Sequence, residues 1–254
     1  MSADAIDLTI LVPALVAGLL VTATHVPLGM QVLARGIVFI DLAIAQIAGC
    51  GVLLADQLGF EPDGVAVQAA ALLAALGGAL LLTWTERVWP EVQEAVIGVV
   101  FVLAATGGIL LLASNVHGSE HLRDLLIGQI LWAQWSRLAW TAVVYAALLA
   151  LWFGAGERLG RTGFYLLFAV AVTVSVQLVG VYLVFATLIV PPLATRRMRR
   201  ARLVAAWALG AIGYAAGLLL STVLDLPSGP AIVWMLVILG LASYATTRAV
   251  APSA

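Results

Sequence analysis

The stretch QLVGVYLVFATLIVPPLATRR, residues 177–197, decides how the chain is organised. Gly180 interrupts an apolar run and permits a close turn, because glycine tolerates backbone conformations that other residues avoid. Pro191 and Pro192 then precede five arginines between positions 196 and 202. Proline cannot donate a backbone hydrogen bond, so this end predicts either irregular backbone buried against protein or the simple end of a helix.

The composition places the whole chain in a membrane. Hydrophobic residues make up 63% of the 254 residues and charged residues 10%, whereas soluble domains carry about 25% charged residues. Twelve basic and 13 acidic side chains are too few to cover the surface of a soluble fold. The net charge of -1 also excludes a basic protein that binds nucleic acid.

Two residue types narrow the possible chemistry. All 12 basic residues are arginine, and without lysine the chain has neither a Walker A loop nor a Schiff-base nucleophile. It therefore cannot be a P-loop ATPase by itself. Cys50 is the single cysteine, which excludes an internal disulfide and a thiolate metal cluster, and we interpret it as a small buried hydrophobic residue.

Apolar runs of about 20 residues predict membrane-spanning helices. Runs of this kind occur at Leu8–Thr24, Gly36–Ala55, Val65–Trp84, Ala95–Ala113, Leu138–Gly156, Gly163–Gln177, Val181–Thr195, Leu203–Leu224 and Ala231–Thr247. The run Leu125–Ala133 is too short to span easily. The expected fold is an all-α polytopic membrane bundle of eight or nine transmembrane helices, forming a single transmembrane domain over residues 1–254.

The arginines predict the orientation of these spans. The positive-inside rule assigns the Arg196–Arg202 cluster to the cytoplasm. Alternating spans then place the amino terminus and the acidic segments Asp56–Asp63 and Ser114–Asp124 outside, with the carboxyl terminus inside. For the spans to alternate in this way, Gly163–Thr195 must be a tight hairpin with both ends on the cytoplasmic side. Because the segment is short for two spans, we expect one arm to be buried against protein.

Asp41 is the first candidate for a functional side chain, because it lies inside the second apolar run. An ionised carboxylate within a span costs about 2.5–3.5 kcal/mol on insertion scales, so such residues usually face a cavity or a partner. Asp41 is therefore a candidate metal ligand. The alternative is that Asp41 lies near the cytoplasmic interface and pairs with Arg35.

Gln46 lies deeper in the same run and is a candidate neutral ligand. A buried glutamine also serves as a polar contact between helices. Asp41 and Gln46 are separated by about 140° around a helix. A joint site would therefore need side chains from neighbouring helices.

His117, Glu120 and His121 form the second candidate metal site, in the segment expected outside. Histidine and carboxylate ligands suit Zn²⁺, and the pattern His-x-x-Glu-His is typical of the inverzincin metallopeptidases. Three interpretations stay open: a solvated loop, capture or gating of a metal, and a catalytic zinc site. His25, close to Pro27, is expected at the membrane interface.

Several segments resemble the permease subunits of the zinc/manganese-type metal-ion ABC transporters. They are Val179–Arg197 with its prolines, the turn Asp225–Pro230, the early stretch from Pro27 through Asp41 and Gln46 to Val52, and Ser114–Val116 with Asp124–Gly128. The resemblance covers nearly the whole chain. Its most specific parts are the proline-containing stretch before Arg196 and the Ser-Gly-Pro sequence in the turn.

The resemblance implies a multi-pass permease of the inner (plasma) membrane that carries no enzymatic activity of its own. It implies a homodimer with a second permease copy, two cytoplasmic ATPase subunits and an extracytoplasmic metal-binding protein. No tightly bound cofactor is expected, and Zn²⁺ or Mn²⁺ would be the transported substrate. Imidazole ligands favour zinc slightly.

The chain departs from the family pattern in three places. Family members commonly carry Asp and His one helical turn apart in the second span, where this chain has Asp41 and Gln46. The cytoplasmic segment that contacts the ATPase is reduced to Glu157–Thr162, so coupling has either moved to the Arg196–Arg202 loop or weakened. The His117, Glu120 and His121 group is additional, and we hypothesise that it replaces the missing histidine from the outer side.

These observations predict the membrane-spanning permease subunit of an ATP-driven zinc or manganese importer. One alternative is an intramembrane zinc metallopeptidase that uses the His117-Glu120-His121 motif. Another is a secondary metal carrier that works without ATPase partners.

Overall fold

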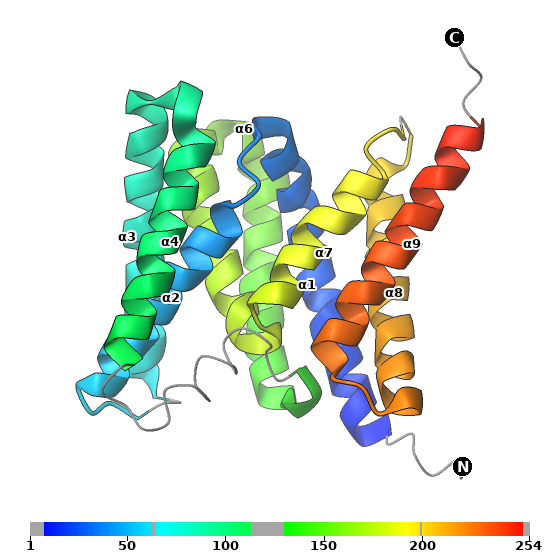
Figure 1. Ribbon diagram of the computed structural model, residues 1–254, viewed down its shortest axis with the longest axis horizontal. Coiled ribbons are helices and arrows are strands. Elements are labelled where there is room, and N and C mark those ends of the chain that lie inside the picture. Colours follow the sequence, from blue (N-terminus) through cyan, green and yellow to red (C-terminus); the bar gives the residue numbers. More distant parts are fainter. Residues whose placement is uncertain (1–7, 62–63, 113–129, 199, 251–254) are drawn as a thin grey trace. The chain divides into compact units, whose positions relative to one another are not determined.

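The computed structural model describes residues 8–61, 64–112, 130–198 and 200–250, and these form helices without any strand. In chain order the elements are α1 (Leu8–Arg35), α2 (Ile40–Gln57), α3 (Val65–Val88), the 3₁₀ helix η2 (Pro90–Val92), α4 (Gln93–Leu112), the 3₁₀ helix η3 (Ile130–Trp132), α6 (Trp135–Val179), α7 (Val181–Ala194), α8 (Arg202–Leu224) and α9 (Ser228–Val250). Figure 1 shows the α-helices as rods.

Eight helical segments in the described residues are long and apolar enough to cross a membrane. Two of them, Trp135–Ala155 and Arg158–Val179, lie within α6, and the 14-residue α7 is a shorter apolar helix. The prediction of an all-α bundle with eight or nine spans is confirmed.

The chain reverses its direction within α6 at Gly160. This residue has φ 61° and ψ −162°, a region of backbone conformation that is essentially restricted to glycine. The rings of Trp152 and Phe164 lie 5.9 Å apart, although 12 residues of straight helix would separate them by about 18 Å. The two arms of α6 therefore fold back on each other.

Two compact units divide the chain. Unit 1 comprises residues 1–35, 127–145 and 178–254, and unit 2 comprises 36–126 and 146–177. The expectation of a single domain stays a prediction.

In unit 2, α2 packs along both α3 and α4, and the three helices run beside one another in Figure 1. Small side chains make this close packing possible. Ala71, Ala75 and Ala79 repeat every fourth residue on α3 and are fully buried. A Cβ atom on Gly51 of α2 would come within 2.6 Å of the Ala70 carbonyl oxygen. In lipid, where hydrophobic burial does not drive helix pairing, small residues of this kind let helices approach and gain dispersion contacts.

In unit 1, the short α7 is packed by α1, α8 and α9. Most of its side chains are buried, including Thr187, Leu188 and both prolines. This confirms the expectation that one arm of the Gly163–Thr195 hairpin is buried against protein. The turn forms at Gly180, with φ 84° and ψ 162°, as the sequence predicted.

Pro191 and Pro192 lie inside the last turn of α7, so the prediction of irregular backbone before the arginines is wrong and the alternative of a helix end holds. The carbonyls of this turn are satisfied from beyond the helix. Both the backbone N–H and the hydroxyl of Thr195 donate to the Pro191 oxygen, at 3.2 and 2.9 Å. The Arg202 guanidinium donates to the Pro192 oxygen at 3.3 Å.

α1 continues through Pro27 to Arg35, eleven residues beyond the apolar run that predicted it. Proline at 27 leaves the Ala23 carbonyl without its helical donor. The indole N–H of Trp207 in α8 donates to this oxygen at 3.2 Å. A neighbouring helix thus restores the hydrogen bond, as is usual for proline within membrane helices.

Candidate functional site

Asp41 occupies the first turn of α2 and is 1% exposed. The backbone N–H groups of Asp41 and Leu42 face its carboxyl group. A negative charge is favourable here because the free N–H groups of a helix start carry partial positive charge. Its Oδ1 nevertheless has no hydrogen-bond partner within the described chain. The structure thus places the predicted acid in the protein interior rather than facing lipid.

Gln46 lies one and a half turns further along α2 and is half-buried. α2 is continuous over both residues, so the predicted offset of about 140° between their side chains applies. The structure therefore does not bring Asp41 and Gln46 together on one face. Their roles as metal ligands stay predictions.

His117, Glu120 and His121 lie outside the described residues. Within the described residues, no group of three or more His, Cys, Asp and Glu side chains could hold a metal ion. A complete metal centre built from these side chains is therefore not present in that part of the chain.

Glu94, in the first turn of α4, is a candidate that the sequence analysis missed. Its Oε1 accepts a hydrogen bond from the backbone N–H of Phe39 at 3.2 Å, immediately before α2 begins. Its Oε2 is buried without a hydrogen-bond partner in the described residues.

An open groove of about 540 Å³ runs along α2 and α4. It is lined by Phe39, Leu42, Ala95, Gly98, Val99, Phe101, Val102 and Leu103. None of these side chains offers an oxygen, nitrogen or sulfur ligand. The groove therefore suits hydrocarbon rather than a cation.

His25 is fully buried in α1, ten residues before the helix ends. The expectation that it lies at the interface is wrong, because α1 extends well past Pro27. Its Nδ1 lies 3.0 Å from both the Thr24 hydroxyl and the Val21 carbonyl oxygen. The Tyr145 ring stands 6.4 Å away. Both contacts of Nδ1 are made within α1 itself.

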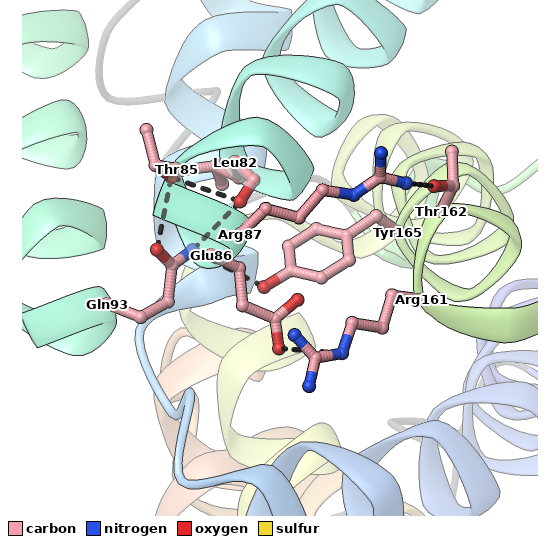
Figure 2. A network of polar contacts seen from close by, with 8 residues as sticks. All are labelled: Leu82, Thr85, Glu86, Arg87, Gln93, Arg161, Thr162 and Tyr165. Atoms are coloured by element: carbon pink, nitrogen blue, oxygen red, sulfur yellow. Dashed lines mark hydrogen bonds and ion pairs between the residues drawn. The ribbon is translucent and has the colours of Figure 1, made fainter. Parts of the chain in front are cut away.

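A polar network joins the end of α3, the start of α4 and the second arm of α6 (Figure 2). Arg87 donates to the Thr162 hydroxyl at 2.9 Å, and Arg161 lies 4.0 Å from Glu86. These contacts tie the short connection around Gly160 to the end of α3. By the placement of arginines, this end of unit 2 is expected at the cytoplasmic side.

The buried part of the network centres on Gln93. Its amide donates to the Leu82 carbonyl at 3.0 Å and to the Tyr165 hydroxyl at 3.4 Å. The Thr85 hydroxyl lies 3.1 Å from the Gln93 Oε1. Gln93 thus links three helical segments of unit 2 by hydrogen bonds (Figure 2).

With eight helical segments in its described residues that are long and apolar enough to cross a membrane, the chain is a multi-pass membrane protein. The particular family follows from comparison with known proteins. The sequence profile of the ABC 3 transport family matches residues 7–159 and 154–247. The chain belongs to this family, and it is a multi-pass permease of the inner membrane in the ABC transporter class.

Solved structures share the fold. One is PsaBC from Streptococcus pneumoniae in complex with a Fab, with a TM-score of 0.71 and 22% identity over 92% of this chain and 89% of that chain. Another is described as a metal-chelate type ABC transporter in an inward-facing conformation. It has a TM-score of 0.67 and 16% identity over 94% of this chain and 85% of that chain. No curated protein sequence matches significantly.

Proposed function

We propose that this chain is the membrane-spanning subunit of an ATP-driven importer of a divalent transition metal, zinc or manganese. Membership of the ABC 3 transport family supports transport, and the likeness to a metal-chelate type transporter supports a metal substrate. The observation that carries the proposal is Asp41, an acid 1% exposed inside a helix long enough to span the membrane. A buried carboxylate of this kind is costly unless a cation or a polar path compensates it.

In this proposal two copies of the chain pair around a central path. Asp41 supplies negative charge, Gln46 a neutral ligand, and His117, Glu120 and His121 capture the metal at the outer mouth. An extracytoplasmic binding protein delivers the metal. Imidazole at the mouth favours zinc over manganese.

ATP hydrolysis belongs to partner subunits, because a chain without lysine cannot form a Walker A loop. Two cytoplasmic segments of this chain would receive the motion that ATP hydrolysis causes in the partner subunits. The Arg196–Arg202 loop presents Arg196 and Arg197 stacked on the Tyr244 ring at 5.6 and 4.9 Å. The short connection at Gly160 is held to α3 by Arg87 and Arg161.

Asp41→Asn tests the proposal because it removes the charge and keeps the volume. In cells expressing the full transporter, we expect this variant to lose accumulation of radioactive zinc and manganese, while Asp56→Asn on the same helix retains it. Equal uptake by both variants, with equal protein levels in the membrane, would contradict a path past Asp41.

Two further measurements separate the alternatives. Glu120→Gln should only weaken uptake, whereas it would abolish a peptidase. Copurification of an ATPase subunit and loss of uptake on ATP depletion are expected. ATP-independent uptake without such a subunit would instead identify a secondary carrier.

A further inference from the structure

The apolar groove along α2 and α4 is open on its outer side. Val99, Val102 and Leu103 line it and are each more than half exposed. Gly98 also lines it, and a Cβ atom on this glycine would meet nothing within 4 Å among the described residues. Both helices are long and apolar enough to cross a membrane. Hydrocarbon from the surrounding lipid can therefore enter the groove.

The length of the groove matches one leaflet of a bilayer. Its lining on α4 runs from Ala95 to Leu103, over which a helix rises about 12 Å. One leaflet contributes about 15 Å of hydrocarbon. Trp84 and Trp89 lie shortly before α4, about half exposed and with ring centroids 5.6 Å apart, and tryptophan is typical of the membrane–water interface. The groove thus extends from the interface towards the middle of the membrane, as an acyl chain does.

Glu94 lies at the interfacial end of this groove. Its Oε1 accepts the hydrogen bond from the Phe39 N–H at 3.2 Å, and Phe39 is part of the lining. Glu94, Gly98 and Phe101 follow one another at helical spacing and share one side of α4. Gly98 and Phe101 line the groove as well. An acidic side chain therefore stands where the headgroup of a lipid in the groove would lie.

The second oxygen of Glu94 lacks a donor. Oε2 is shielded from solvent and has no hydrogen-bond partner in the described part of the chain, a state that is rare for buried polar atoms. Glu94 as a whole is only half-buried, and the last torsion of a glutamate is soft. Rotation of the carboxyl group can thus present Oε2 to a donor at the membrane surface. A positively charged donor suits it best, because hydrogen bonds between ions are strong.

We infer that the groove binds one phospholipid with a primary ammonium headgroup, of the phosphatidylethanolamine class. The ammonium group donates to Glu94, and one acyl chain lies along Gly98 and Val102. An anionic headgroup would bring like charge to the carboxylate, and a choline headgroup has no N–H to donate. The placement of arginines puts this end of α4 at the cytoplasmic side, so the lipid comes from the cytoplasmic leaflet. The inference does not depend on which ion is transported.

Native mass spectrometry of the purified, delipidated full-length protein tests this inference. It measures the binding of phosphatidylethanolamine, phosphatidylcholine and phosphatidylglycerol with identical acyl chains. Gly98→Leu fills the groove at a position where an added Cβ has room. Gly107→Leu is its matched control, because Gly107 on the same helix has the same room but does not line the groove.

A second pair of variants tests the headgroup contact. Glu94→Gln removes the charge, while its amide oxygen can still accept the hydrogen bond of Phe39. Glu61→Gln is the control, since Glu61 is exposed and lies beyond the other end of α2. Thermal unfolding in detergent checks that every variant is folded.

We expect the unmodified chain to bind one phosphatidylethanolamine about tenfold more tightly than either other lipid, as a hydrogen bond to a charged group allows. Glu94→Gln should reduce this preference to about threefold or less, and Glu61→Gln should keep it. Gly98→Leu should lose the tightly bound lipid, and Gly107→Leu should retain it.

Three results would overturn the inference. Equal binding of the three lipids by the unmodified chain, or an unchanged preference in Glu94→Gln, would show that Glu94 holds no headgroup. Unchanged lipid binding by Gly98→Leu would place the lipid elsewhere. If Gly98→Leu instead turns a dimer into monomers, which the measured mass reveals, while lipid binding stays the same, a second copy of the chain covers the groove.

Discussion

The carbonyl oxygen of Leu188 in α7 lies directly against Gly29 in α1, where a Cβ atom would overlap it. Leu188 is the residue whose helical donor would be the nitrogen of Pro192, which carries no hydrogen. The oxygen is therefore free of its usual helical bond and faces a residue without a side chain. This contact sets how closely α1 and α7 approach within unit 1.

Gly29→Ala should therefore destabilise the protein by about 1–3 kcal/mol, the usual cost of forcing extra atoms into a packed interior. Gly77→Ala in α3 is the control, because an added Cβ at that position meets nothing within 4 Å. The control should be neutral or slightly stabilising, since alanine is the better helix former. Thermal unfolding in detergent measures both, and equal melting temperatures would contradict the close contact.

Thr187 and Tyr214 should respond unequally to the loss of their hydroxyls. Thr187 donates its single hydroxyl hydrogen to the Leu183 carbonyl at 2.7 Å, so the Tyr214 hydroxyl is the donor in the 2.8 Å bond between them. Thr187→Val leaves a fully buried Tyr214 hydroxyl without an acceptor, which should cost about 1–3 kcal/mol. Tyr214→Phe leaves Thr187 its own bond and should cost less. The order of the two melting temperatures checks this, and the reverse order would mean that Tyr214 accepts instead.

The buried and exposed parts of the polar network in Figure 2 should contribute unequally to the free energy of unfolding. Gln93→Leu removes hydrogen bonds to Leu82 and Tyr165 and should cost about 1–2 kcal/mol. Arg161→Gln removes an ion pair at 4.0 Å in which the arginine side chain is 58% exposed and the Glu86 side chain 13% exposed. At this distance, and with a solvated arginine, the pair should contribute no more than about 1 kcal/mol. Chemical unfolding of the two variants in mixed micelles provides the comparison. A larger loss for Arg161→Gln would show that the ion pair holds this end of the unit.

Gly160 and Gly180 should not tolerate alanine. Both combine a positive φ with ψ near ±160°, which costs other residues about 1–3 kcal/mol. Because Gly160 reverses the chain within α6 and Gly180 separates α6 from α7, the substitutions should lower the yield of folded protein in membranes as well as its melting temperature. Normal yields for Gly160→Ala and Gly180→Ala would mean that the turns can form in another way.

The arginine placement predicts that residue 200 lies in the cytoplasm and residue 226 outside. In a Cys50→Ala background, Leu226→Cys should react with a membrane-impermeant maleimide on intact cells. Arg200→Cys should react only after permeabilisation. Both native side chains are exposed, so access is not limited by the protein, and the opposite pattern would invert the proposed topology.

The sequence was sufficient to predict the helical segments and to identify Asp41 as a candidate functional residue. Backbone groups in a membrane must be hydrogen-bonded inside the protein, and in a helix nearly all of them bond within their own segment, so apolar length alone predicts the spans. An acid inside such a run is conspicuous. Glu94 does not stand out in the sequence, because it follows Trp89-Pro90-Glu91 at the edge of a span, where acidic residues are common.

His25 shows where local reasoning failed. Pro27 suggested a helix end close by, but α1 continues because Trp207, 184 residues further along, donates to the Ala23 carbonyl. The residues around Pro27 give no sign of that hydrogen bond.

Hydropathy was thus enough for the number and nature of the spans, because transfer into lipid depends on composition summed along one segment. The hydrogen bond from Phe39 to Glu94, the contact of Leu188 with Gly29 and the burial of α7 emerged only from the folded chain. Association of helices in lipid depends on the shapes and hydrogen bonds of particular facing side chains, which no single segment contains.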